Sequence, residues 1–170
     1  MDFLELAKNR YSVRDFKEDK VPKDIIDKIL EAGYIAPTAC NRQGFKVTVV
    51  TSKEGMEKFR KCTECHFGAP MAMIVSYDKN LSWDRPWDHE KSGPVDASIV
   101  ATHLMLEAYN LGVGSTWVMY FIPEAIKVEF DFDENFEPVV VLPMGYPKDD
   151  AKPSPLHSSF RNQSEIIEWR

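Results

Sequence analysis

Two arginines flank a serine at alternating positions near the start of the chain, in the stretch RYSVRDF that runs from Arg10 to Phe16. If this stretch is extended, successive side chains point to opposite faces, so that Arg10, Ser12 and Arg14 share one face. That face offers two cationic donors and a hydroxyl, which suits a small oxygen-rich dianion such as the phosphate of a mononucleotide. The alternative is a solvated basic turn after a helix, and the spacing alone favours that alternative.

A second segment, APTACNRQGFKV from Ala36 to Val47, changes this balance. Together the two segments resemble the flavin-dependent nitroreductase family, whose members begin with an Arg-x-Ser-x-Arg phosphate motif and later carry Pro-Ser/Thr-x-x-Asn-x-Gln before the first strand. Residues 96–117 look like the family's long central helix and the glycine-rich turn after it. Residues 145–147, followed by Arg161, look like its C-terminal signature. These four motifs stand in the family's order and cover nearly the whole chain.

The resemblance implies an FMN-dependent oxidoreductase. In that family a non-covalently bound FMN accepts a hydride at N5 from NADH or NADPH and then reduces a second substrate, such as a nitroaromatic, a quinone or an enone, in ping-pong order. The flavin carries the chemistry while the protein supplies placement and electrostatics, so no catalytic side chain is expected. Two alternatives remain: a non-catalytic or sensory flavin-binding module, and a redox or metal protein centred on Cys62 and Cys65.

The resemblance also implies which residues bind the cofactor. Arg10, Ser12 and Arg161 would hold the phosphate, and Arg14 would reach the pyrimidine edge of the ring, where a cation stabilises the anionic reduced flavin. Tyr11 belongs to the same motif. One departure is Ser159, which stands where the family often has a basic residue.

Two further segments would enclose the flavin ring. The first is a loop that reaches across a dimer to the neighbour's flavin, and the second is a strand expected over 114–120. Many family members have a glycine near Met119, and here none follows Trp117. The implied contacts are Pro37, Thr38, Ala39, Asn41 and Gln43 in the loop, and Trp117, Val118 and Met119 in the strand.

Length and composition limit the class of protein. A chain of 170 residues and 19.5 kDa predicts one domain, residues 1–170. A net charge of −6 argues against general nucleic-acid binding, and no apolar run approaches the roughly 20 residues of a membrane span. The first residues lack the pattern of a signal peptide, and three cysteines with no export signal predict a reducing, cytoplasmic location.

Hydrophobic periodicity and capping signals predict alternating helices and strands, and hence an α/β or α+β layered fold. The resemblance makes this a mixed, mostly antiparallel central sheet flanked by helices in a homodimer. Residues 146–170 would form an extended C-terminal arm on the partner subunit, with a frayed tail as the alternative. The predicted helices are 2–9, 22–33, 54–61, 95–111 and 123–130, and the predicted strands are 45–50, 71–77, 114–120 and 139–144.

Three other features carry weaker hypotheses. The pentapeptide from Cys62 to His66 has the spacing of a c-type haem attachment site, but we interpret it as incidental ahead of a redox dithiol, a metal site or a haem site. Cys40 is expected to be a small apolar filler. The segment with Trp83, Trp87 and His89 is either a substrate lid or a hydrophobic contact under a long loop.

Overall fold

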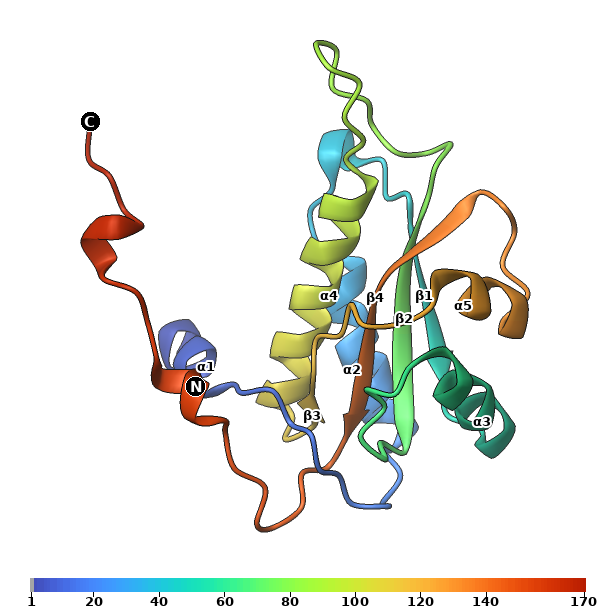
Figure 1. Ribbon diagram of the computed structural model, residues 1–170, viewed down its shortest axis with the longest axis vertical. Helices are drawn as coiled ribbons and strands as arrows, with labels where there is room; N and C mark the ends of the chain where they lie inside the picture. Colours follow the sequence, from blue (N-terminus) through green and yellow to red (C-terminus); the bar gives the residue numbers. More distant parts are fainter. Residues whose placement is uncertain (1) are drawn as a thin grey trace.

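One open antiparallel sheet, with strands in the order β1-β2-β4-β3, forms the centre of the computed structural model, which describes residues 2–170 (Figure 1). The strands are β1 (Phe45–Val50), β2 (Met71–Asp78), β3 (Gly114–Ser115) and β4 (Phe136–Gly145). The helices are α1 (Phe3–Asn9), α2 (Lys23–Tyr34), α3 (Lys53–Cys62), α4 (Gly93–Asn110) and α5 (Pro123–Glu129), with short 3-10 turns η1 (Ala39–Asn41), η2 (Pro155–Ser158) and η3 (Gln163–Glu165). The predicted layered α+β fold is confirmed.

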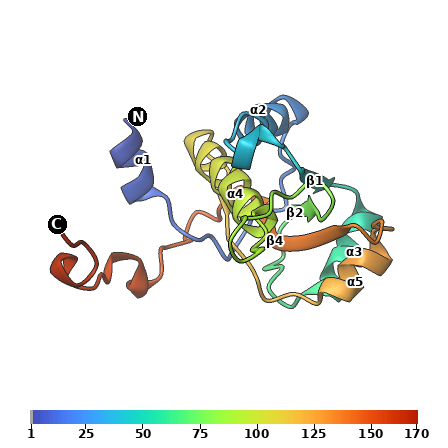
Figure 2. The ribbon, with the colours of Figure 1, turned by 90° about the horizontal axis from the view of Figure 1, so that it is seen from above.

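The sheet is the middle of three layers: α2 and α4 cover one face, and α3 and α5 cover the other (Figure 2). The alternation of side chains along β2 explains why this strand is apolar throughout. Met71, Met73 and Val75 pack under α2 and α4, while Ala72 and Ile74 pack against the α3 and α5 side. Both faces of the central strands are therefore core, as the continuous apolar run predicted.

The stretch from Arg10 to Phe16 is extended and lies along the outer edge of β3. Ser12 forms a parallel bridge with Ser115, and the N–H of Val13 donates to the Ser115 carbonyl at 3.0 Å. Val13 is 1% exposed, and a Cβ added at Gly114 would lie only 2.6 Å from its Cγ2. The absence of a side chain at Gly114 thus allows the close approach that fixes this stretch.

The predicted strand over 114–120 is mostly wrong. Only Gly114–Ser115 pair regularly with β4, and Val118 makes one further isolated bridge to Val141. The N–H of Thr116 still donates to the Pro143 carbonyl, and only after Val118 does the chain leave the sheet edge and cross toward α5, so that Met119 and Tyr120 are exposed. The periodicity predicted a strand because Trp117, Val118 and Tyr120 are strand-forming residues, but tertiary packing decides their conformation.

The two ends of the chain lie side by side and away from the three layers (Figures 1 and 2). Helix α1 buries none of its residues, and the hydroxyl of Tyr11 donates to the Ala151 carbonyl of the C-terminal arm at 3.4 Å. The arm exposes Phe160 to 85% and Trp169 to 93% within this single chain. Large exposed apolar side chains are typical of surfaces that contact another molecule.

Candidate functional site

A hollow of about 320 Å³ lies where the N-terminal stretch meets the C-terminal arm. We call it the arginine hollow; its lining residues are Arg10, Tyr11, Ser12, Arg14, Ser154, Leu156 and His157. The predicted shared face of Arg10, Ser12 and Arg14 is confirmed, since all three line this hollow while Val13 points into the core.

The two guanidinium groups of the arginine hollow have no acidic partner. Neither Arg10 nor Arg14 has a carboxylate oxygen within 4 Å among residues 2–170: Arg10 Nη1 contacts Met105 Sδ at 3.8 Å, and Arg14 Nη1 contacts the Ser12 carbonyl at 3.4 Å. Partial burial lowers the pKa of Arg10 from its ordinary value. In an acidic chain, two arginines left without carboxylates beside a serine hydroxyl form a site that suits an oxyanion.

Arg161 does not reach this hollow in the single chain. Its guanidinium is exposed and pairs with Glu165 in the next turn of the arm, at 3.3 Å. The hollow instead receives Ser154 and His157, which sequence reasoning missed. Nothing in the sequence indicates that the arm folds back against the N-terminal stretch and brings His157 to it.

The loop from Pro37 to Gln43 is a tight turn around η1. Within it, the N–H of Gln43 donates to Thr38 Oγ1 at 3.0 Å, and the N–H of Ala39 donates to Asp96 Oδ1 at 2.9 Å. Cys40, Asn41 and Gln43 all have positive φ angles, and the three side chains are exposed. The prediction that Cys40 is a packed filler is wrong, and the turn instead presents its short side chains outward.

The loop and the arginine hollow lie on opposite sides of α4. The loop contacts Asp96 in the first turn of the helix, whereas Arg10 contacts Met105 near its other end. These two positions are nine residues apart, which is about two and a half turns, so they face opposite directions and are separated by about 14 Å along the axis. One chain therefore does not bring the two predicted halves of the site together.

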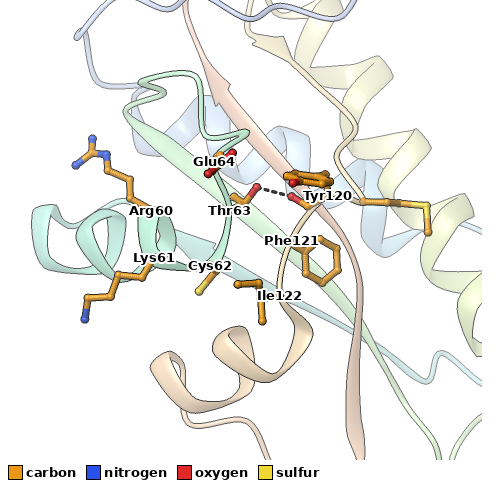
Figure 3. Close-up of a pocket in the computed structure, with 9 residues that line it drawn as sticks. Arg60, Lys61, Cys62, Thr63, Glu64, Tyr120, Phe121 and Ile122 are labelled. Atoms are coloured by element: carbon orange, nitrogen blue, oxygen red, sulfur yellow. Dashed lines mark hydrogen bonds between the residues drawn. The ribbon is translucent and has the colours of Figure 1, made fainter.

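A second hollow, of about 440 Å³, lies between the end of α3 and the segment that follows Val118. We call it the α3 hollow. Figure 3 shows the hydroxyl of Thr63 bonded to the Tyr120 carbonyl, while Arg60 and Lys61 extend away from that contact. Its lining includes Met119, Tyr120, Phe121 and Ile122, so the predicted contact Met119 borders a largely apolar surface.

The other two residues of this segment that were predicted to contact the ring, Trp117 and Val118, are turned toward the protein. Val118 is buried and exchanges both of its backbone hydrogen bonds with Val141, at 3.0 Å each. Trp117 is half-buried against the core under α4. The backbone N–H groups of Met119 and Tyr120, by contrast, donate to no acceptor within residues 2–170. Together with the N–H of Trp117, which also has no acceptor within residues 2–170, they are the main-chain donors that this segment offers to a ligand.

The Cys62 to His66 segment lacks the features of a redox or metal site. Cys62 is fully buried, its thiol donates to the Lys58 carbonyl at 3.4 Å, and burial raises its pKa to about 11. His66 Nδ1 accepts from the Gly68 N–H at 3.0 Å. No cluster of three metal-ligating side chains occurs in residues 2–170. A neutral, buried thiol is a poor nucleophile and a poor ligand.

We expect Cys62 to resist alkylation in the native protein at pH 8. With a pKa of about 11, the thiolate fraction is about 100-fold below that of an ordinary cysteine. Iodoacetamide labelling followed by peptide mass spectrometry measures this, with the unfolded protein as the reference in which all three thiols react. Labelling of Cys62 at similar rates in the native and unfolded samples would contradict the burial.

The segment with Trp83, Trp87 and His89 projects beyond the start of α4. An antiparallel bridge and an ion pair of 2.6 Å join Asp84 to Lys91 across its base. Trp87 at its tip is 86% exposed. Arg42 of the Pro37–Gln43 loop donates to the Ser82 carbonyl at 3.3 Å, so this segment and the loop lie at the same end of the molecule. The hypothesis that this segment is a substrate lid stays a prediction.

Comparison with known proteins identifies relatives of this chain. The sequence model of the Nitroreductase family matches residues 7–67 and 62–146. A Methanothermobacter thermautotrophicus protein, provisionally named an NADH dehydrogenase/NAD(P)H nitroreductase, is 33% identical over 165 residues, which cover 88% of this chain and 80% of that protein.

Solved structures agree with the family match. A nitroreductase family protein of Clostridium difficile 630 superposes with a TM-score of 0.94 at 40% identity and covers 99% of this chain and 98% of its own. An Exiguobacterium sibiricum 255-15 protein, solved in complex with FMN, has the same fold with a TM-score of 0.83 at 21% identity, over 100% and 98% of the two chains. The chain belongs to the nitroreductase family.

Proposed function

We propose that this protein is an FMN-dependent NAD(P)H oxidoreductase that reduces a small acceptor such as a nitroaromatic, a quinone or an enone. The observation that carries the proposal is the arginine hollow, where two guanidinium groups without carboxylate partners lie beside the Ser12 hydroxyl. A terminal phosphate fits these donors. The names of relatives, which include an NAD(P)H nitroreductase and an NADPH-dependent oxidoreductase, support the reaction class.

The chain's own residues position the cofactor in this proposal. Arg10 and Ser12 bind the phosphate, and Arg14 contributes positive charge toward the pyrimidine edge. The apolar surface of the α3 hollow and the free N–H groups of Met119 and Tyr120 receive the ring. Bound FMN supplies the hydride and electron transfer chemistry. Arg161 joins the phosphate only if the arm shifts, because its guanidinium pairs with Glu165 in the single chain.

We further propose that the protein acts as a homodimer with each site shared between subunits. The Pro37–Gln43 loop lies behind α4 relative to the arginine hollow, so a complete site needs that loop from a second copy. Helix α4 also carries an open shallow face that includes Val95, Ile99 and His103, and Val95 is 60% exposed. Two antiparallel copies of this face would bring the loop of one chain to the hollow of the other.

We also propose a C-terminal arm that packs on the partner subunit and a cytoplasmic location. Residues 1–170 form one domain, and the arm over 146–170 packs on the partner subunit, which would cover Phe160, Ile166 and Trp169. No helix within residues 2–170 has the length and apolarity to cross a membrane. Three cysteines in the chain agree with our proposal of a cytoplasmic protein, and a net charge of −6 agrees with our proposal that it does not bind nucleic acid.

Release of the cofactor from the purified protein tests the proposal. We expect heating to release FMN in a one-to-one ratio with the chain, identified by co-elution with authentic FMN, because the hollow offers donors for one phosphate. Anaerobic NADH or NADPH should bleach the flavin band, and a quinone or nitroaromatic should restore it. Stoichiometric FAD, or no flavin after reconstitution, would defeat the cofactor assignment. Bound flavin that neither nucleotide bleaches would leave a binding module instead of an enzyme.

A further inference from the structure

His157 lies on the arm side of the arginine hollow, opposite the N-terminal stretch. The turn η2 that carries it is fixed locally, since the N–H of His157 donates to the Ser154 carbonyl at 2.8 Å. Tyr11 packs against the imidazole ring in an edge arrangement with centroids 6.4 Å apart. The ring is therefore held by both segments that form the hollow.

The contact of His157 with α1 determines which of its ring nitrogens is available. Its Nε2 lies 3.1 Å from the Lys8 carbonyl oxygen. Because a carbonyl oxygen only accepts hydrogen bonds, Nε2 carries the proton in this contact. The second ring nitrogen, Nδ1, is then the unprotonated atom of the neutral ring, and it becomes a donor when the ring takes up a proton.

The charged side chains that line the hollow beside His157 are both basic. They are Arg10 and Arg14, and the lining of the hollow includes no carboxylate. No carboxylate lies within 4 Å of the His157 ring among residues 2–170. A dianion bound between the arginines would favour the cationic imidazolium of His157, because an opposite charge nearby stabilises it.

We propose that His157 is the third cationic ligand of the FMN phosphate, taking up one proton from solvent as the dianion enters the arginine hollow. This inference rests on the function proposed above. It gives the site a positive charge from the arm, which neither Ser159 nor the paired Arg161 supplies in the single chain. Nδ1–H donates to a phosphate oxygen while Nε2–H remains on Lys8.

Proton uptake makes the phosphate contribution depend on pH. A histidine whose pKa is higher in the complex than in the free protein contributes fully below its free value, and the contribution is lost as the pH rises through the bound value. The phosphate itself is a dianion above about pH 7. Between about pH 7 and pH 9 the affinity for FMN, relative to riboflavin, should therefore fall by about five- to tenfold.

Fluorescence titration of the flavin-free full-length protein with FMN and with riboflavin tests the inference. His157→Gln keeps a donor for the Lys8 carbonyl but cannot become cationic, so FMN should bind about tenfold more weakly at pH 7, with no decline toward pH 9. His157→Lys keeps a charge throughout this range and should retain FMN affinity without the pH dependence. Lys152→Gln, which removes an exposed charge from the same arm outside the hollow, should behave as the wild type.

The outcomes separate this inference from the proposed function. A His157→Gln variant with the wild-type FMN affinity and pH profile would overturn the role of His157 alone. So would an equal loss of FMN and riboflavin, because it would mean that the ring only supports the fold. Failure of the wild-type protein to bind either flavin would defeat the proposed function itself.

Discussion

Replacing Arg10 with alanine is expected to weaken FMN binding by at least tenfold while riboflavin binding changes little. A charge-assisted hydrogen bond to a phosphate contributes about 1.5–3 kcal/mol, and the Arg10 guanidinium pairs with no carboxylate within residues 2–170. Equilibrium titration with both ligands, monitored by the quenching of flavin fluorescence, measures the difference. The comparison with riboflavin isolates the phosphate contact, because the two ligands share the ring and the ribityl chain.

Two control variants sharpen the Arg10 result. Arg10→Lys keeps the charge but loses the planar fork of donors, so its loss should be intermediate. Arg170→Ala removes the same charge from a guanidinium that already pairs with Glu168 at 2.9 Å, and it should leave both affinities unchanged. Equal losses of FMN and riboflavin in Arg10→Ala would show that the contact with Met105 supports the fold and that the guanidinium does not bind phosphate.

Mixing two inactive variants, Arg10→Ala and Asn41→Ala, is expected to restore activity. In a shared-site dimer the two residues of one site come from different chains. A mixed dimer therefore carries both defects in one site and leaves the other site wild type, so each mixed dimer regains one of its two sites. Activity should rise on subunit exchange, measured as NAD(P)H oxidation with a quinone acceptor and calibrated against the fraction of mixed dimers found by native mass spectrometry.

A matched mixture distinguishes this recovery from a general stabilisation by dimer exchange. Arg10→Ala and Ser12→Ala both alter the same half of the site, so every site in their mixed dimer lacks one phosphate ligand and no wild-type site forms. That mixture should stay near the activity of its parents. If the Arg10→Ala and Asn41→Ala mixture also stays inactive, although mixed dimers are present, each site belongs to one chain and α4 does not separate its two halves.

Local sequence determined the elements and one face of the site. The apolar run of β2 predicted a strand covered on both faces, and packing under α4 on one side and α3 on the other confirms it. The alternation of Arg10, Ser12 and Arg14 predicted a shared face, because extended backbone fixes side-chain direction within a few residues. The capping aspartate before α1 and the proline before α2 likewise mark helix starts whose signals lie within one turn.

Tertiary structure decided how distant segments combine. The sequence predicted a strand through Tyr120, but the paired length of β3 depends on where the chain leaves the sheet for α5. The resemblance predicted that Arg161 and Arg10 bind the same phosphate. The arm instead places Arg161 against Glu165 and places His157 in the arginine hollow. From the sequence we interpreted Cys40 as packed and the Cys62 to His66 motif as incidental, and only burial distinguishes the exposed thiol of Cys40 from the buried thiol of Cys62.

The physical reason for this division is the range of the interactions concerned. Backbone geometry, capping and hydrophobic periodicity act between neighbours in the chain, so the residues themselves determine them. Burial, charge pairing and the pKa of a side chain depend on atoms brought from elsewhere: Met105 beside Arg10, Lys8 beside His157, and Asp96 beneath Ala39. The sequence by itself thus determined which residues could hold a phosphate, whereas the fold decided that the arm completes their hollow and that α4 separates it from the loop.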